Sequence, residues 1–246
     1  MKSTNDNPNA LKAATVSGLR DTLRKHNTDL DKIQKNLEDY LETKRASFPR
    51  FYFLSNDELL EILAETKDPH RVQKHLSKCF EGIAKLEFNA TLDIRAMFSS
   101  KGERLEFQPL PKSEGGRFIN PMSSGSNVEV WLLQVESSMR AVVSRNIDLA
   151  VSSFKSAPDN ISWVRMWSQQ AALAVSEVMW TSEIGHAIAS GGPPALRLYG
   201  QALTQQLQPI IKLVRGVLTT LDRGTFTNMV VLAVHKRDVV QGMAGQ

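Results

Sequence analysis

The chain has 246 residues, of which 41% are hydrophobic and 23% are charged. This composition is typical of a folded globular protein and argues against a disordered chain. Thirty Lys and Arg residues against 26 Asp and Glu residues leave a net charge of only +4, and the two signs are interspersed. Nucleic-acid binding is therefore not expected, because it favours a basic surface on one side of the protein.

Cysteine content and hydropathy exclude two further classes of protein. The single cysteine, Cys79, cannot form an intramolecular disulfide and fits a reducing compartment. No stretch approaches the length of about 18 consecutive apolar residues that a membrane-spanning helix needs. The opening segment MKSTNDNPNA also lacks the apolar core of a secretory signal. The sequence therefore predicts a soluble intracellular protein that makes no membrane contact.

Residues 11–46 have the pattern of one long helix. Apolar side chains recur at alternating steps of three and four residues, which is the spacing of a heptad seam. The seam consists of Val16, Leu19, Leu23, His26, Leu30, Ile33, Leu37 and Tyr40. We expect its one polar member, His26, to pack at the edge of a pair of helices.

The stretch FPRFYFLSNDELLEIL, residues 48–63, concentrates aromatic rings where the long helix ends. Pro49 predicts that end, because a residue before proline is pushed out of the α region. Ser55, Asn56 or Asp57 is expected to cap a second, short helix. The rings suggest either a binding site or a packed structural corner, and their position at the helix break favours the corner.

The middle of the chain combines short helices with a small β element. Residues 70–83 predict a helix with Val72, Leu76, Cys79, Phe80 and Ile83 on one face. Apolar alternation on either side of the turn residues 99–102 predicts a β-hairpin over residues 92–107. The stretch from 109 to 125, rich in Pro, Gly and Ser, predicts a flexible loop.

The remainder, from residue 127, predicts a bundle of helices, one of which Asp159 or Asn160 is expected to cap. Trp163 and Trp167 are spaced to share one helical face, and AALAVSEVMW (171–180) predicts a centrally buried helix. GGPP at 191–194 predicts that one helix ends there and that another begins. Pro209 is expected to kink or break the helix that follows, since proline lacks an amide donor.

A second heptad-like seam runs through the helices after GGPP. It consists of Leu203, Leu207, Ile210, Val214, Val217 and Leu221, and a final helix follows it. The predicted fold is mainly α, an elongated helical bundle with one small β-hairpin. Four segments are expected: a heptad-patterned helix (1–47), short helices with the hairpin (48–110), a loop (111–126) and the bundle (127–246).

No catalytic, cofactor-binding or metal site is predicted. Phosphate-binding glycine motifs are absent, and the spacing of His70 and His75 places them on different faces of a helix. The most enzyme-like cluster is His235-Lys236-Arg237-Asp238, in which His235 and Asp238 lie three residues apart, but the solvated, ion-paired face of an amphipathic helix explains it better. Cys79 lies among apolar residues and is expected to be a small buried side chain.

The quoted stretch 48–63, followed by KDPHRVQKHLSKCFEGIAKLEF, resembles the linker region of dynein heavy chains, most closely the axonemal branch. The resemblance continues in family order through RAMFSSKGERLEF and NVEVWLLQVESSM. It extends through the segment from Trp163 to Trp180 with its MWTSEI, and then through LVRGVL and VHKRDVV. It covers roughly residues 10 to 240, and details around residues 68–84 are most similar to inner-arm members.

The resemblance implies the C-terminal half of a dynein linker, with a dynein-linker-like helical fold. Such a linker lies across a ring of AAA+ modules and bends as ATP is bound and hydrolysed, so that it drives movement along a microtubule. ATP and Mg²⁺ would be bound by AAA+ modules of the parent heavy chain and not by this chain. The implied partners are that AAA+ ring, other dynein subunits and, through the parent motor, the microtubule. The implied location is the cytoplasm and cytoskeleton, in the axoneme of a cilium or flagellum.

Two departures from the family pattern, Pro209 and the long polar loop 111–126, prevent transfer of individual contact residues. A different class of function also fits the sequence: a stand-alone helical interaction protein that binds axonemal partners through the seam at 16–40. An enzyme using His235 and Asp238 is the third and weakest hypothesis.

Overall fold

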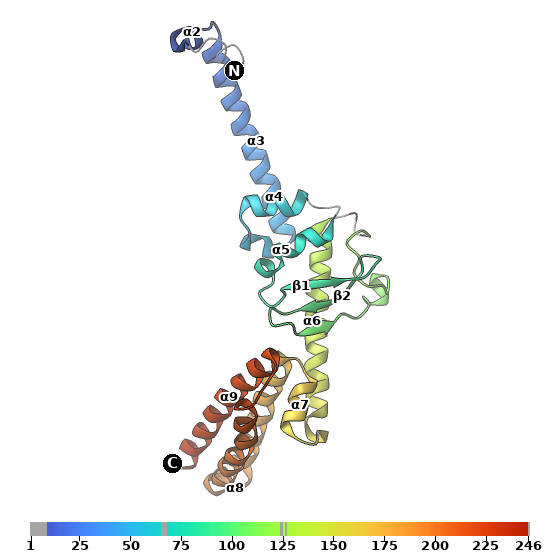
Figure 1. Ribbon diagram of the computed structural model, residues 1–246, viewed down its shortest axis with the longest axis vertical. Coiled ribbons are helices and arrows are strands. Elements are labelled where there is room, and N and C mark those ends of the chain that lie inside the picture. Colours follow the sequence, from blue (N-terminus) through green and yellow to red (C-terminus); the bar gives the residue numbers. More distant parts are fainter. Residues whose placement is uncertain (1–8, 65–67, 124, 126, 246) are drawn as a thin grey trace. The chain divides into compact units, whose positions relative to one another are not determined.

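The computed structural model describes residues 9–64, 68–123, 125 and 127–245. The chain divides into a first unit, residues 1–64, and a second unit, residues 65–246. Helices dominate both units, and the second also contains a small antiparallel sheet, which confirms the predicted fold class (Figure 1). Within the described ranges, no helix is both long enough and apolar enough to cross a membrane.

The first unit begins with two helices where the sequence pattern predicted one. Helix α2 covers Ala10–Ala14 and α3 covers Leu19–Ser47. Gly18 separates them in the left-handed region, with φ of +76°. The prediction of a continuous helix over 11–46 is therefore wrong at its start, because glycine adopts this conformation at no steric cost.

The end of α3 follows the prediction made from Pro49. Phe48 is extended, with φ of −135° and ψ of 94°, and Pro49–Phe53 form the short 3₁₀ helix η1. Helix α4, Asn56–Ala64, then begins with a reciprocal cap. The Glu58 amide donates to the Ser55 hydroxyl at 3.3 Å, and the Ser55 amide donates to the Glu58 carboxylate at 3.1 Å. Such a capping box satisfies two amides that the helix leaves free.

The second unit opens with α5, Pro69–Cys79, which the Asp68 side chain caps. The prediction of a helix to residue 83 is wrong in its last turn, since Phe80 is already extended with φ of −134°. Phe80 and Ile83 are nevertheless buried, so they belong to the apolar core as predicted.

The sheet has three antiparallel strands in the order β1–β2–β3. The predicted hairpin is confirmed as β2, Ile94–Phe98, and β3, Arg104–Glu106. Strand β1, Lys85–Phe88, was not predicted; its Leu86 lies opposite Met97 of β2. The segment that follows the sheet contains one 3₁₀ helix, η2, Lys112–Glu114. It is also attached to β2, since the Ile94 amide donates to the Ile119 carbonyl at 2.8 Å.

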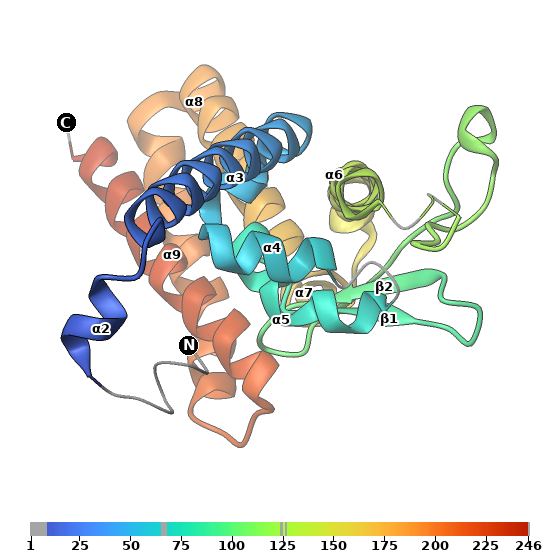
Figure 2. The same ribbon diagram turned by 90° about the horizontal axis from the view of Figure 1, so that it is seen from above.

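Helix α6, Val128–Ser153, is seen nearly end-on beside β1 and β2 in Figure 2. The 3₁₀ helix η3, Phe154–Ser156, follows, and α7, Asn160–Met166, begins after the predicted cap Asp159. The Asp159 carboxylate accepts from the Ser162 amide at 2.9 Å. The prediction that Trp163 and Trp167 share a helix is wrong, because Trp167 is extended and lies after the last turn of α7.

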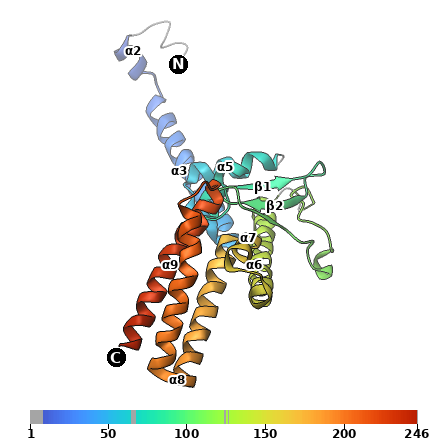
Figure 3. The same ribbon diagram turned by 60° about the horizontal axis from the view of Figure 1, so that its bottom comes forward.

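Helix α8, Gln169–Val214, is interrupted at Gly192, with φ of 56° and ψ of −139°, where the sequence predicted a stop. Its first arm (169–191) and second arm (193–214) run side by side with α9, Thr220–Ala244 (Figure 3). The predicted break at Pro209 is wrong, since Gly192 alone leaves helical geometry in α8. The second seam also ends early, because Val217 lies beyond α8 and is fully exposed.

The core of this bundle gathers around Trp163 and Phe226, which are almost completely buried. From the first arm, Ala171, Ala172 and Val175 pack into it, whereas Val178 is 55% exposed. The prediction that residues 171–180 form a centrally buried helix is therefore wrong. The arm is amphipathic, and its small residues allow close approach of neighbouring helices.

Alanine substitutions at two glycines of α8 are expected to change stability in opposite directions. Gly192→Ala is expected to destabilise the second unit by about 1–3 kcal/mol, because its backbone conformation is strained for any residue with a Cβ atom. Gly185 lies within the first arm, and no atom lies close to the position of an added Cβ. Gly185→Ala is therefore expected to stabilise the second unit by about 0.5–1 kcal/mol. Chemical denaturation followed by tryptophan fluorescence measures both, since all four tryptophans lie in the second unit. Equal effects of the two substitutions would contradict the assignment of Gly192 as the reversal point.

Candidate functional site

The structure does not bring the enzyme-like pair together. His235 is exposed, and the Asp238 carboxylate accepts two hydrogen bonds from the neighbouring Arg237, at 2.9 and 2.7 Å. Cys79 is buried, as predicted. His70 lies against the ring of Phe88, with ring centres 4.7 Å apart. Among the described residues, no three His, Cys, Asp or Glu side chains form a metal-binding cluster.

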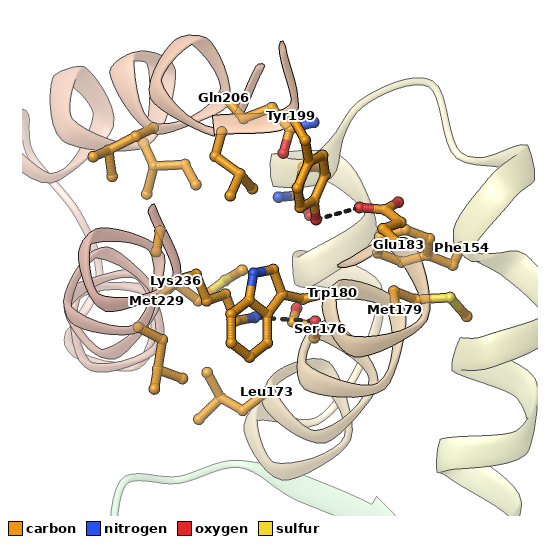
Figure 4. A pocket seen from close by; sticks show the side chains of 16 residues that line it. Phe154, Leu173, Ser176, Met179, Trp180, Glu183, Tyr199, Gln206, Met229 and Lys236 are labelled. Carbon is orange, nitrogen blue, oxygen red and sulfur yellow. Dashed lines mark hydrogen bonds between the residues drawn. The ribbon is translucent and has the colours of Figure 1, made fainter. Parts of the chain in front are cut away.

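A small cavity lies between the two arms of α8 and helix α9 (Figure 4). Its volume is about 70 Å³. Pockets that hold drug-sized ligands usually measure about 300–1,000 Å³, so a nucleotide would not fit here. The cavity is lined mainly by apolar side chains, and a few polar groups converge on it from the three helices. These polar groups act between helices, as described next.

Lys236 connects α9 to the first arm of α8. Its ammonium group donates to the Ser176 carbonyl at 3.0 Å (Figure 4). The same ammonium lies 2.9 Å from the Glu177 carboxylate. The same group lies 5.7 Å from the centre of the Trp180 ring. Lys236 is only 8% exposed, so the prediction of a solvated face is wrong for this residue. A buried ammonium needs such partners, because its desolvation is otherwise costly.

Tyr199 connects the second arm to the first. Its hydroxyl donates to the Glu183 carboxylate at 2.6 Å (Figure 4). Burial and this carboxylate both raise the pKa of the Tyr199 hydroxyl, so the side chain stays a neutral donor. Arg197, also on the second arm, donates to the Ala244 carbonyl of α9 at 3.2 Å. Each pair among the three helices is thus joined by a polar contact.

Trp163 fastens α7 to the end of α6. Its indole N–H donates to the Ala150 carbonyl at 3.2 Å and to the Ser153 hydroxyl at 3.0 Å. The ring meets Phe154 edge-on, with centres 4.9 Å apart. Trp131 and Trp163 are both core residues, 2% and 1% exposed.

The aromatic corner of the first unit splits into an inner and an outer pair of rings. Phe48 and Phe51 are fully buried and meet edge-on, with centres 4.9 Å apart. Tyr52 and Phe53 are 58% and 69% exposed. The prediction that the rings pack the helix break therefore holds for the inner pair and is wrong for the outer one.

Polar side chains of α3 also contact residues of the same corner. Arg45 donates to the Asn56 side chain at 2.7 Å and lies over the Tyr52 ring. Tyr52 donates a hydrogen bond to Glu42. The joint between α3 and α4 is thus held by buried rings inside and by side-chain hydrogen bonds outside.

The predicted heptad seam of α3 lies on the surface. Its exposed members are Val16, Leu23, Leu30, Ile33, Leu37 and Tyr40, with exposed fractions from 38% to 62%. His26 is exposed as well, so the prediction that it packs at the edge of a helix pair is not met within the described residues. Leu41 is the one buried residue of α3. The seam is the second candidate for a functional surface.

Neither the cavity nor the seam has an arrangement of groups that would carry out a reaction. Both units contain places where side-chain contacts hold two helices together, which we call fastened helix joints. In the first unit this is the aromatic corner; in the second unit these are the Trp163 anchor and the polar contacts of Lys236 and Tyr199. Such joints hold helices at set angles and allow one helix to move its neighbour.

Comparison with known proteins identifies the family. The model of the family described as "Dynein heavy chain, N-terminal region 2" matches residues 1–150. Mouse dynein axonemal heavy chain 12 is 47% identical over 245 residues, which cover 99% of this chain and 8% of that protein. Human dynein axonemal heavy chain 3 is 45% identical over 230 residues (94% and 5%), and human dynein axonemal heavy chain 1 is 41% identical over 242 residues (98% and 5%). The chain thus spans less than a tenth of the length of these relatives. It belongs to the dynein heavy chain family, in the linker region, and its relatives are axonemal.

Proposed function

We propose that this chain is a mechanical segment of the linker of an axonemal dynein heavy chain. In that role it passes shape changes of the AAA+ ring, driven by ATP, to movement along a microtubule. The observation that carries this proposal is the continuous match to axonemal heavy chains over 99% of the chain. It implies that the whole chain, rather than one motif, is built for the same role as the matched region.

The fastened helix joints support a mechanical role. Both units contain helices joined at corners by buried aromatic rings, and the second unit also has polar contacts between helices. Close-packed interiors deform little and transmit strain, so a push on one helix reaches the next. The proposal assigns no chemistry to this chain. ATP and Mg²⁺ are bound, in this account, by the AAA+ modules of the parent heavy chain.

The finer placement follows the motifs quoted from the sequence. We assign the chain to the C-terminal half of the linker and to an inner-arm type of axonemal dynein. Its partners are then the AAA+ ring of its own heavy chain and other dynein subunits, with the microtubule reached through the parent motor. Its location is the axoneme of a cilium or flagellum.

A segment exchange tests the proposal. The 245 matched residues of mouse dynein axonemal heavy chain 12 are replaced by the present chain, and microtubule gliding and ATP hydrolysis of the chimera are measured. We expect the chimera to glide microtubules, because the helix joints are supplied by the exchanged segment. A chimera in which the same stretch is deleted serves as the control and is expected to hydrolyse ATP without gliding. Loss of gliding in the exchanged chimera, with its ATPase activity intact, would contradict the proposal.

The exposed seam of α3 favours one alternative, a stand-alone helical protein that binds axonemal partners. The two functions differ in what the gene encodes. A transcript in which this segment continues into a nucleotide-binding AAA+ module supports the motor segment. A mature transcript that encodes this segment alone, translated in ciliated cells, supports the interaction protein.

A further inference from the structure

We propose that Ser47 is a phosphorylation site for a serine kinase that selects basic sequences, and that the aromatic corner controls the access of the kinase to it. The site lies wholly in the first unit, so its chemistry does not depend on the proposed function. In the proposed motor segment, it would allow a kinase to loosen the joint between α3 and α4.

The sequence around Ser47 has the charge pattern of a kinase substrate. Ser47 lies in KRASF, residues 44–48, so that Lys44 and Arg45 stand three and two residues before it and Phe48 follows it. Among all serines and threonines of the sequence, Ser47 alone has Lys or Arg at both of these positions. Kinases that select basic sequences place carboxylates in the substrate groove, and these pair with cationic side chains before the serine. The sequence therefore singles out Ser47 as the substrate of such a kinase.

The Ser47 hydroxyl is accessible at the end of α3. The side chain is exposed, and its hydroxyl donates to the Thr43 carbonyl of the same helix at 3.0 Å. In the transfer, the Ser47 Oγ forms a bond to the γ-phosphorus of ATP, and the bond from that phosphorus to the bridging oxygen of ADP breaks. The hydroxyl proton passes to a base of the kinase and ADP leaves. No other element of the first unit has to move away from the hydroxyl itself.

The side chains that a kinase would recognise are held in the aromatic corner. Arg45 donates to the Asn56 side chain at 2.7 Å, and its own side chain is only 14% exposed. Phe48 is 0% exposed and packs edge-on against Phe51. A groove that reads side chains on both sides of a residue needs an extended segment. The closed corner thus withholds the side chains on both sides of the hydroxyl, and opening of the corner releases them.

An added phosphate would in turn favour the open corner. Phosphorylation removes the hydroxyl proton, so the Thr43 carbonyl loses this donor and faces an anion. A charge of about −1.5 to −2 at the last residue of a helix also opposes the helix dipole. The phosphate competes for the Arg45 guanidinium as well, because a charged acceptor binds it more strongly than the Asn56 amide oxygen does. A kinase therefore reaches the open corner, and its product stabilises that state.

Phosphate incorporation tests the site. The 246-residue chain is incubated with ATP, Mg²⁺ and a purified serine kinase that selects basic sequences, and the modified residues are identified by mass spectrometry. We expect phosphate on Ser47, and none at this position in Ser47→Ala. Ser77→Ala is the matched control, because Ser77 is exposed and follows Lys74 by three residues, but the residue two before it is the buried His75. This control is expected to incorporate as much phosphate on Ser47 as the unsubstituted chain.

Variants of the corner test whether it controls access. Phe51→Ala opens the corner and is expected to raise the rate of Ser47 phosphorylation at least about tenfold, because modification of an opened state follows the population of that state. Phe53→Ala removes an exposed ring and should leave the rate unchanged. Failure of Ser47 to accept phosphate even in Phe51→Ala would overturn the inference, and equal rates in the two variants would contradict control by the corner.

Two further substitutions separate release of the site from general unfolding. Asn56→Ala removes the acceptor of Arg45 and keeps both buried rings, so the unit stays folded and the rate is expected to rise by about threefold or more. Arg45→Gln is introduced into Phe51→Ala, where the corner is already open. We expect this double variant to lose most of the phosphorylation, because the kinase loses a cation that it recognises. An unchanged rate in both proteins would show that neither release nor recognition of Arg45 matters, which contradicts the inference.

Hydrogen exchange of the phosphorylated chain tests the effect of the phosphate on the corner. Amides of residues 41–62 are expected to exchange about fivefold faster or more after phosphorylation, because the added charge disfavours the last turn of α3. The chain phosphorylated in the Ser77→Ala background should behave in the same way, and Ser47→Ala treated with the kinase should not change. Slower or unchanged exchange in the phosphorylated chain would contradict an opening of the corner by the phosphate.

Discussion

Replacing Phe51 with alanine is expected to destabilise the first unit by about 3–5 kcal/mol, the usual cost of removing a fully buried phenylalanine ring. Phe51 is 0% exposed, and its ring meets Phe48 edge-on at the point where α3 gives way to α4. Because the backbone turns sharply there, neighbouring side chains have little freedom to close the gap. The cavity would therefore persist and the corner would open more often.

Phe53→Ala provides the matched control for this prediction. It removes the same ring two residues away, but the ring is 69% exposed, so its loss is expected to change stability by less than about 0.5 kcal/mol. The first unit contains no tryptophan. Hydrogen exchange of residues 41–62 is therefore the suitable measurement, with opening expected to increase by about a hundredfold or more in Phe51→Ala. A cost below about 1 kcal/mol would mean that the ring is not a packing element, and the binding-site interpretation of the corner would return.

Trp163→Ala is expected to destabilise the second unit by about 3–5 kcal/mol. The indole is 1% exposed and donates to both Ala150 and Ser153 at the end of α6. Its removal leaves a cavity in the core and frees α7 from α6. Trp163→Phe keeps most of the ring volume and loses the N–H donor, so we expect a smaller loss, about 1–2 kcal/mol.

Denaturant unfolding followed by the fluorescence of the remaining tryptophans measures this effect. Met166→Ala, in the same helix, is the control, because Met166 is 63% exposed and its truncation should cost less than about 0.5 kcal/mol. Equal losses from Trp163→Ala and Met166→Ala would show that Trp163 is not the anchor of α7.

Local backbone chemistry made several of the element boundaries predictable from sequence. Pro49 ended α3, Ser55 and Asp159 began helices, and Gly192 reversed α8, each through a preference that acts within a few residues. These preferences need no knowledge of the rest of the fold.

The features that sequence reasoning missed depend on distant partners. Strand β1 is four residues long and gains its hydrogen bonds from β2, so its own pattern was too short to indicate a strand. Lys236 is charged and was assigned to solvent, although Ser176 and Glu177, sixty and fifty-nine positions earlier in the sequence, make its burial possible. The continuation of α8 through Pro209 likewise shows that the surrounding helix outweighs one lost amide donor.

The seam of α3 illustrates another case, in which the pattern was recognised but the expected packing is not seen among the described residues. Periodicity identified Leu23, Leu30 and Leu37 as one face, and the structure places all three on that face. The described residues leave this face largely exposed.

The coupling between ATP hydrolysis and movement in the heavy-chain chimera tests the central claim most directly. Gliding speed and ATPase rate are measured together for Phe51→Ala and Phe53→Ala. If this segment transmits force through its helix joints, Phe51→Ala will lower the distance moved per ATP hydrolysed, and Phe53→Ala will match the unsubstituted chimera. Unchanged coupling in Phe51→Ala, with its corner shown by hydrogen exchange to be open, would contradict a mechanical role for this segment.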